Sequence, residues 1–406
     1  MKIAIIIQRY GPEILGGAEQ LASVVAAVLK EKCEVTVLTT TAKDHLSWKP
    51  HYKPGESKVD NIRIVRFSVD YIRDDYFHRL HTVYLNGIPL NEFLNLSETD
   101  KAAWLKFAKR TPIAFQEEMI KAQGPYSSSL LGYLAKHQDE YDRILFFTYL
   151  YATTYFGLGI LNATDHAYIY PTLHDEPLVY LDIWQRYKDC MLLFSTKEEY
   201  ELAESVLGEV KGSIVNYGLV DRGGDTHREA STTGEPYIIY AGRIEHAKGI
   251  DHLLKYFIRF RQASGLPLRL KLIGKCSMEV PYTVKDGVDL LGFVSEEEKL
   301  KLFQNALCAV IPSPNESLSI VLLEAFMMSS PVLVNGLCKV LLGHVQQSGG
   351  GCAYKEYSEF ADFLDNLIKQ SGLRETLGDK GRAYYLSHYE WSRYKVGLME
   401  ALDIKL

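Results

Sequence analysis

The chain has 406 residues and a formal net charge of −6, and 47% of its residues are hydrophobic and 24% charged. A single hydrophobic core usually stops growing below this length, so the length predicts two domains of roughly 200 residues each. The excess of acidic over basic residues disfavours nucleic acid as the main partner, because phosphate binding relies on lysine and arginine.

The composition also disfavours a membrane-spanning or disulfide-bonded protein. No apolar run reaches the roughly 18 residues that a spanning helix needs. The short apolar run at the start is typical of a buried first strand rather than of a cleavable signal. The six cysteines form no Cys-x-x-Cys pair, and several lie in apolar runs, as reduced core cysteines do. We therefore expect a cytoplasmic location.

Strand-like apolar runs alternate with helical patterns through the first half of the chain, which implies parallel strands joined by right-handed crossovers. The predicted strands lie at 2–7, 34–40, 62–67, 143–147, 167–170, 191–195 and 213–215, with a helix at 18–32. Residues 70–124 interrupt this alternation with polar and aromatic sequence. Their clearest helix begins at Ser97, whose Ser-x-x-Asp pattern resembles a capping box. We interpret 70–124 as a helical insertion in the first domain.

Residues 221–235 have the composition of a linker, because they are polar, contain glycine and show no apolar period. A second α/β series follows the linker. Its predicted strands lie at 237–242, 268–274, 288–293, 308–312 and 331–334, and its helices at 250–262, 296–305 and 319–328. The fold class is therefore α/β, with two Rossmann-like domains and a site expected in the cleft at the carboxyl ends of their strands.

The segment 312–334 carries the most informative chemistry. A predicted strand ends at Pro312, the following turn carries Glu316, and a helix begins near Ser319. The first turn of a helix has unpaired backbone N–H groups and the positive end of the helix dipole, which favours an anionic phosphate. Glu316 lies just before this helix and Glu324 lies inside it. The two carboxylates could flank a bound diphosphate, one accepting ribose hydroxyls and the other reaching a sugar.

The spacing Glu316-x7-Glu324, followed by Ala325 and Pro331-Val332, resembles the E-x7-E signature of retaining GT-B glycosyltransferases, especially glycosyltransferase family 4 (glycosyl transferases group 1). The resemblance implies the GT-B fold, a nucleotide diphosphate sugar as donor, and retention of anomeric configuration. It also implies that the start of the helix binds the donor, through Ser317, Leu318, Ser319 and Ile320.

Two cations follow the first strand of the second domain, in AGRIEHAKG. Arg243 and Lys248 are residue types that clamp phosphates, although loop cations are more often solvated surface charges. The pair resembles the family's G-R-x-x-x-x-K-G element, whose arginine and lysine contact the donor diphosphate. With Glu316 they form the expected catalytic group.

Two further motifs lie in the first domain. Gly16 and Gly17 stand between the first strand and the first helix, where glycine lets backbone amides approach a ligand. They resemble the family's loop that faces the donor phosphates. His174 follows a strand end in AYIYPTLHDEP and resembles the family's His-Asp element, whose histidine contacts the transferred sugar. The neighbouring Asp175 is a second candidate, and the alternative for both is an ordinary structural role.

Shorter matches extend the resemblance over most of the chain. Gly274 and Val294 end strands that hold the nucleobase in the family, and Trp391-Ser392 resembles the start of its tail. The expected domains are therefore 1–220 on the acceptor side, 236–382 on the nucleotide-sugar side, and a C-terminal helix at 383–406 that crosses back to the first. The chain departs from the family after Val334, where NGLCKVLLGHVQQSGGG replaces a glycine-rich segment with a glutamate. The identity of the sugar is therefore not carried over.

These motifs predict a retaining glycosyltransferase that moves a hexose or related sugar to a hydroxyl acceptor, as in polysaccharide biosynthesis. The acceptor could be a glycan, a lipid-linked molecule or a small molecule. No Asp-x-Asp motif is present, so we expect neither metal nor cofactor. The alternatives are a sugar-phosphate synthase, a nucleotide-sugar epimerase or a non-catalytic sugar-nucleotide-binding protein. A nicotinamide enzyme is disfavoured, because its G-x-G-x-x-G fingerprint is missing.

One stretch of the insertion leaves a membrane partner open. In residues 97–110, Trp104, Leu105 and Phe107 are interleaved with lysines, as in helices that lie on a membrane surface. Such a helix would give a peripheral contact at the inner face of the membrane. The alternative is an ordinary amphipathic helix that packs on the first domain. The nucleobase, linkage and oligomeric state are not given by the sequence.

Overall fold

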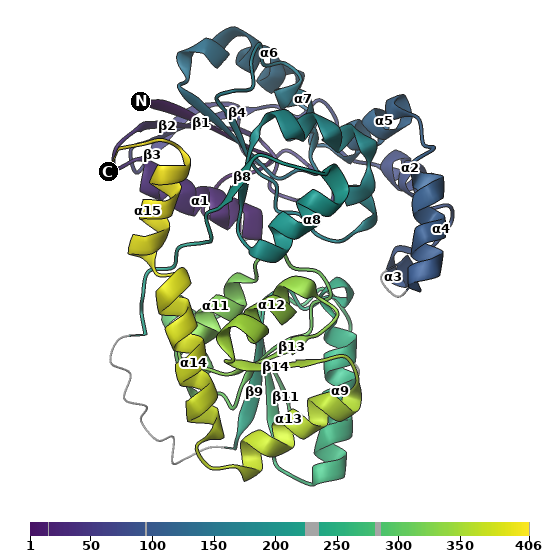
Figure 1. The fold of residues 1–406 in the computed structure, drawn as a ribbon, viewed down its shortest axis with the longest axis vertical. Coiled ribbons are helices and arrows are strands. Elements are labelled where there is room, and N and C mark those ends of the chain that lie inside the picture. The colour runs from purple at the N-terminus through teal and green to yellow at the C-terminus, as the bar shows by residue number, and fades with distance from the viewer. Residues whose placement is uncertain (15, 94–95, 224–234, 281–285, 406) are drawn as a thin grey trace. The chain divides into compact units, whose positions relative to one another are not determined.

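The computed structural model describes residues 1–14, 16–93, 96–223, 235–280 and 286–405. These residues form two compact units (Figure 1). Unit 1 comprises Met1–Asn216 and Lys395–Leu406, and unit 2 comprises Tyr217–Tyr394. Most of the predicted linker, 224–234, lies outside the described residues. Within the described residues, no helix is both long and apolar enough to cross a bilayer.

Unit 1 is built on an eight-stranded sheet in the order β3-β4-β2-β1-β5-β6-β7-β8. The strands are β1 (Lys2–Ile7), β2 (Glu34–Thr40), β3 (Gly55–Val59), β4 (Ile62–Phe67), β5 (Arg143–Phe147), β6 (Ala167–Tyr170), β7 (Met191–Phe194) and β8 (Gly212–Ile214). All neighbours pair in parallel except β3 and β4. The seven parallel strands are those predicted from apolar runs.

The strand β3 was not predicted. All five of its residues are exposed, so it carries no apolar signal. It forms a hairpin with β4 across Asp60 and Asn61, which both have positive φ. Two residues of this conformation make the turn whose twist matches that of paired strands. The turn chemistry, rather than hydrophobic periodicity, therefore specifies this edge of the sheet.

Helices cover both faces of this sheet, with α1 on one face and α6 and α7 on the other (Figure 1). The α-helices of unit 1 are α1 (Gly17–Leu29), α2 (Asp75–Tyr84), α3 (Leu90–Phe93), α4 (Glu98–Ala108), α5 (Ile113–Gln123), α6 (Ser128–His137), α7 (Ala152–Leu158) and α8 (Lys197–Leu207). The 3-10 helices are η1 (Gln138–Glu140), η2 (Pro177–Tyr180) and η3 (Asp182–Asp189). Helix α15 (Trp391–Ala401) begins in unit 2 and ends in unit 1.

Residues 70–124 fold as α2 to α5, and Ser97 caps α4 by accepting a hydrogen bond from the backbone of Asp100. The burial of Trp104 favours the alternative for this helix, in which it packs on the first domain. Trp104 is 3% exposed and packs against Tyr84, Phe93 and Tyr180. Trp104 therefore belongs to the core of unit 1, and α4 packs on this unit through it.

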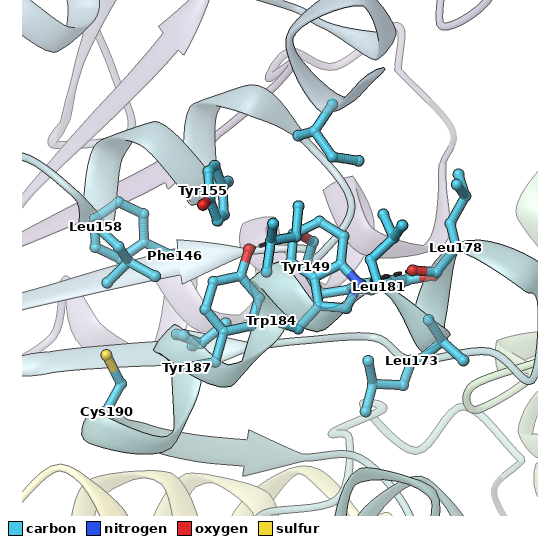
Figure 2. Packing of buried hydrophobic residues seen from close by; sticks show 14 of the residues in the cluster. Phe146, Tyr149, Tyr155, Leu158, Leu173, Leu178, Leu181, Trp184, Tyr187 and Cys190 are labelled. Carbon is cyan, nitrogen blue, oxygen red and sulfur yellow. Dashed lines mark hydrogen bonds between the residues drawn. The ribbon is translucent and has the colours of Figure 1, made fainter. Parts of the chain in front are cut away.

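Aromatic side chains fill much of the core of unit 1 around the segment that follows β6 (Figure 2). Trp184 of η3 stacks on Tyr187 and meets Tyr149 and Tyr155 edge-on. The buried polar atoms of these rings are paired, because Tyr187 donates to the carbonyl of Tyr149 at 2.7 Å and Trp184 to that of Leu178 at 2.7 Å. This cluster anchors both ends of the loop that carries His174.

Unit 2 has a six-stranded parallel sheet in the order β11-β10-β9-β12-β13-β14. Its strands are β9 (Tyr237–Ala241), β10 (Arg269–Ile273), β11 (Val288–Gly292), β12 (Ala309–Ile311), β13 (Val332–Asn335) and β14 (Gly351–Tyr354). Its helices are η4 (His246–Lys248), α9 (Ile250–Ser264), α10 (Glu296–Asn305), α11 (Ile320–Met327), α12 (Lys339–Ser348), α13 (Tyr357–Lys369) and α14 (Leu373–His388). Helices α9 and α13 pack together on one face, and α11, α12 and α14 cover the other, where α10 packs against α11 (Figure 1).

Candidate active site

The strand ends of unit 2 approach one another closely. Gly274 follows β10 with φ +128°, and a Cβ there would lie 2.0 Å from the carbonyl oxygen of Gly242. Gly249 begins α9 with φ +73°, and its Cβ would lie 2.3 Å from the carbonyl oxygen of Pro312. Only glycine fits both places. The predicted donor-binding Gly274 therefore has a packing role at the edge of the sheet where β9 and β10 end.

The turn between β12 and α11 has a strained start. Ser319 precedes α11 with φ 69° and ψ 79°, and its side chain makes no capping hydrogen bond. A non-glycine residue in this left-handed region costs on the order of 1–2 kcal/mol, and such residues cluster at functional sites. Its neighbours Ser317 and Ile320 are half-buried, and Leu318 is buried. The predicted donor-binding turn is therefore held in one uncommon conformation.

Lys248 and Glu316, which are 68 residues apart, are in contact. The Lys248 ammonium donates to Glu316 Oε1 at 2.7 Å, and both side chains are largely shielded, with 24% and 19% exposed. Lys248 lies in η4, immediately before Gly249, whose close approach to Pro312 brings the two loops together. Because they are partly buried, the two charges interact more strongly than a surface ion pair.

Arg243 lies on the same loop but has another partner. Its guanidinium binds Glu245 at 2.9 Å and is half exposed, and the Tyr240 hydroxyl donates to its carbonyl at 2.7 Å. Burial, followed by the charges of Glu316 and Glu245, raises the pKa of Tyr240. Glu245 and Tyr240 were not predicted from the sequence. The one signal for Glu245 and Tyr240 in the sequence is their position within YAGRIE, close to the two cations of this loop.

Glu324 is buried in α11, as its helical position inside the predicted motif suggests. Its Oε1 accepts from Lys299 of α10 at 2.9 Å, while no described residue donates to Oε2. Burial raises the pKa of Glu324, and the charge of Lys299 opposes that rise. Lys299 was not predicted from the sequence. Its side chain meets Glu324 only because α10 packs along α11.

In unit 1, the backbone of the loop after β6 is held by Glu199 of α8. The Glu199 carboxylate accepts from the amides of Leu173 at 2.9 Å and Ser195 at 2.8 Å. Burial raises the pKa of Glu199 to about 7, although its hydrogen bonds to backbone amides favour the anion. The loop contains Thr172 at φ 51°, a rare conformation for a β-branched residue. Glu199 thus positions the turn that carries His174.

Asp175 forms an ion pair and hydrogen bonds with other residues of unit 1. Its Oδ1 accepts from Lys101 of α4 at 2.8 Å and from the Tyr180 hydroxyl at 2.6 Å. The insertion is therefore tied to the residue next to His174. This partner of Asp175 could not be predicted from the sequence, because Lys101 is 74 residues away and is one of several lysines near α4.

The glycine loop before α1 contains a buried ion pair that the sequence analysis missed. Glu19 is 4% exposed and accepts from Gln8 at 2.9 Å and from the Arg9 guanidinium, with which it forms an ion pair at 2.6 Å. A Cβ on Gly16 would lie 1.9 Å from Glu19, whereas one on Gly17 would meet nothing within 4 Å. Gly16 therefore makes room for a carboxylate of the protein itself, and Gly17 has open space.

The remaining predicted residue, Val294, follows β11 and is half-buried, next to the 70% exposed Phe293. In the part of the chain that the structure describes, no group of three or more His, Cys, Asp or Glu side chains is placed to hold a metal. The geometry thus gathers Lys248, Glu316 and the start of α11 in unit 2.

Comparison with known proteins is consistent with this geometry. Residues 224–384 match the family model described as glycosyl transferases group 1. An uncharacterized glycosyltransferase of Methanocaldococcus jannaschii is 28% identical over 39% of this chain and 42% of that protein. The alpha-D-kanosaminyltransferase of Streptomyces kanamyceticus is 25% identical over 43% and 44%, respectively. The matches thus span less than half the length of these relatives.

Solved structures match over nearly the whole chain. A sucrose-phosphate synthase from Thermosynechococcus elongatus has a TM-score of 0.67 at 14% identity and covers 98% of this chain and 97% of its own. A glycosyltransferase involved in lipopolysaccharide biosynthesis has a TM-score of 0.62 at 14% identity, with 98% and 99% covered. At these identities the likeness concerns the fold, and it confirms the prediction of GT-B architecture. Residues 224–384 thus match the glycosyl transferases group 1 model, in a chain that has the GT-B fold.

Proposed function

We propose that the chain is a glycosyltransferase that moves a sugar from a nucleotide diphosphate sugar to a hydroxyl acceptor. The contact between Lys248 and Glu316 beside the start of α11 carries this proposal, because it joins a phosphate-binding cation to a sugar-binding carboxylate. Relatives support the donor class. A trehalose-6-phosphate protein of E. coli was solved with UDP-2-fluoro glucose, and an Anabaena protein with UDP and glucose.

The proposed chemistry is mainly electrostatic. When the bond between sugar and diphosphate breaks, negative charge develops on the leaving phosphate, and the ammonium of Lys248 and the amides at 317–320 would stabilise it. A bound diphosphate would compete with Glu316 for this ammonium, which would leave Glu316 available to the sugar hydroxyls. Arg243 would exchange Glu245 for phosphate in the same way. The resemblance of His174 to the family's His-Asp element supports a contact of its side chain with the sugar.

Retention of configuration and independence of metal are finer parts of the proposal. Retention follows if the acceptor attacks from the face that the diphosphate leaves, with the leaving phosphate taking the acceptor's proton. The E-x7-E spacing supports retention, and the cationic residues in place of a carboxylate cluster support metal-independent transfer. A role in polysaccharide biosynthesis is supported by a similarity of 27% identity to a capsular polysaccharide biosynthesis glycosyltransferase of Staphylococcus aureus.

Thermal shift with a panel of UDP, GDP and ADP sugars tests the donor class. A ligand at 100 times its Kd stabilises the folded protein by roughly 2.7 kcal/mol, which gives a clear shift. NMR of the product from a responding donor then gives its anomeric configuration. An epimerase would release an altered nucleotide sugar without acceptor, and a non-catalytic binding protein would return the donor unchanged. Failure of all three nucleotide classes to bind would refute the proposal.

A lipid-linked acceptor would require a peripheral membrane contact. With Trp104 buried, the exposed apolar side chain of α4 is Phe107, which is 37% exposed between the exposed Lys106 and the buried Ala108. Sedimentation with anionic liposomes tests this contact. A protein that stays wholly in the supernatant would favour a soluble acceptor.

A further inference from the structure

Lys299 occupies an unusual position for a lysine. Its side chain is 19% exposed and its ammonium contacts two carboxylates, Glu324 Oε1 at 2.9 Å and Glu296 Oε2 at 3.0 Å. Helix α10, which carries it, is anchored by the buried Leu300 and Phe303. The ammonium is therefore presented to Glu324 by a helix whose orientation is set by the core.

Glu324 needs such a partner because it is nearly enclosed. Its side chain is 9% exposed, and a buried carboxylate is costly unless it is paired. The charged or titratable groups that face Glu324 are Lys299 and Glu296 of α10, together with Tyr217 and Arg222 from the segment before β9. Among the described residues, Lys299 is the one that donates a hydrogen bond to it.

Lys299 opposes the effect of burial on the Glu324 carboxylate. Burial raises the pKa of Glu324, and the charge and hydrogen bond of Lys299 oppose the rise. For Lys299 itself, burial acts to lower the pKa, but the charge of Glu324 and the hydrogen bonds to both carboxylates outweigh it, so the pKa is raised. An ammonium that remains protonated thus faces a carboxylate that would otherwise tend to take up a proton.

The second oxygen of Glu324 distinguishes this pair from a purely structural one. Buried ion pairs that only stabilise a fold usually satisfy both carboxylate oxygens, since a buried unpaired acceptor is destabilising. Here Oε2 has no hydrogen-bond donor among the described residues. The carboxylate is thus held at one oxygen and lacks a partner at the other, as a group that binds a ligand hydroxyl would be.

We propose that Lys299 is a positioning residue for the donor site, which holds the Glu324 carboxylate so that its second oxygen accepts hydroxyl groups of a nucleoside diphosphate. This role rests on the proposed function of the chain. Lys299 acts through Glu324 and does not itself contact the nucleotide.

Removal of the Lys299 ammonium should weaken nucleotide binding to an extent that depends on pH. Without Lys299, burial acts on Glu324 with no hydrogen-bonded cation to oppose it, so Glu324 takes up a proton at a higher pH. The protonated carboxyl is a weaker acceptor for a hydroxyl than the anion. The affinity of a Lys299→Met protein for nucleoside diphosphates should therefore fall, and the loss should increase as the pH is lowered from 8.5 to 6.

Isothermal titration of UDP, GDP and ADP between pH 6 and 8.5 tests this role. The matched control is Lys301→Met, which removes an exposed lysine from the same helix, paired with Glu297. The ratio of variant to wild-type Kd cancels the titration of the ligand's own phosphate. At pH 8.5 we expect Lys299→Met to weaken nucleotide binding by roughly tenfold. This factor corresponds to the loss of one charge-assisted hydrogen bond between Glu324 and a hydroxyl of the nucleotide. Lys301→Met should bind as wild type at every pH.

A double-mutant cycle keeps the test valid if Lys299→Met also lowers stability. In a Glu324→Gln background, Lys299→Met should have no further effect on affinity, because the group that it positions is already neutral. Lys299→Arg should restore most of the affinity. If the ratio of variant to wild-type Kd does not change with pH, or if the two substitutions have additive effects on affinity, the proposed role of Lys299 is wrong, while the proposed function of the chain still stands. A wild-type protein that binds none of the three nucleotides would instead overturn the proposed function.

Discussion

The buried imidazole of His344 offers a quantitative test of how unit 2 supports its site. His344 lies in α12 and is 2% exposed. Its Nε2 is 2.8 Å from the carbonyl oxygen of Leu318, and its Nδ1 is 3.1 Å from the Tyr384 hydroxyl. Since a carbonyl can only accept, Nε2 carries the proton and Nδ1 accepts from Tyr384. The neutral ring thus holds the backbone directly before the strained Ser319.

The size of the effect follows from burial. Burial lowers the pKa of His344 to about 4, against a usual value near 6.5. Between these values the unfolded chain binds a proton that the folded chain does not, so the contribution of His344 is fully present above pH 6.5 and is lost as the pH falls towards 4. About 1.4 kcal/mol accompanies each pH unit, which gives roughly 3 kcal/mol in total.

The substitution His344→Gln separates the hydrogen bond from the titration. Glutamine can donate to the Leu318 carbonyl through its amide, so stability at pH 7.5 should stay within about 1–2 kcal/mol of wild type. It cannot titrate, so the dependence on pH between 6.5 and 4 should disappear. His344→Ala removes the donor as well and leaves the Leu318 carbonyl buried without a partner, which should lower stability at every pH by about 2–4 kcal/mol.

Hydrogen exchange followed by mass spectrometry gives the opening free energy of β12 and β13 directly, which avoids mixing the two units in one transition. From pH 6.5 to 4.5, wild type should lose about 2–3 kcal/mol more than His344→Gln. His252→Gln, which changes an exposed histidine of α9, serves as the control and should follow wild type. Parallel curves for wild type and His344→Gln would refute the account of His344.

Three further substitutions test the site residues. Lys248→Met should reduce turnover by about 10²–10³, while the wild-type enzyme should keep its activity in excess EDTA. Activity that EDTA abolishes and magnesium restores would contradict the proposed binding of the diphosphate by Lys248. His174→Ala should lower turnover but leave affinity for the free nucleoside diphosphate near wild type, and a full rate would make His174 structural. Gly274→Ala should destabilise unit 2 by more than about 2 kcal/mol, because its Cβ would lie 2.0 Å from the Gly242 carbonyl. Gly132→Ala, with nothing within 4 Å, should be neutral or stabilising, and equal melting temperatures for the two glycine variants would count against this close approach.

The parallel strands could be predicted from the sequence because burial on both faces leaves a continuous apolar run, as in β1 and β5. The edge strand β3 could not be predicted in that way, since all its residues are exposed. The contact between Lys248 and Glu316 was foreseeable from topology, because both residues follow strands whose carboxyl ends lie at one edge of the same sheet. Motif spacing thus located the residues that follow strand ends.

Residues on helices that support the site from neighbouring elements were not predicted, and there is a physical reason. Lys299, Glu199 and His344 lie within helical patterns, where a single polar residue usually faces solvent. Their function depends on which helix packs against which loop, and that is decided by the tertiary structure. The sequence around Trp104 is ambiguous for the same reason, since its pattern fits a buried face as well as an interfacial one, and the structure shows Trp104 buried.

The two units stabilise a strained loop at a strand end in the same way. Each has a loop at a strand end with a non-glycine residue in the left-handed region, Thr172 at φ 51° and Ser319 at φ 69°. Such a conformation persists only where the surroundings over-determine it. In each unit a buried titratable side chain on another element bonds to the backbone beside the strained residue, Glu199 to the amide of Leu173 and His344 to the carbonyl of Leu318. The proposed sugar-binding and phosphate-binding loops thus owe their shape to side chains that need not touch a ligand, so substitutions at Glu199 or His344 should alter activity through the loops they hold.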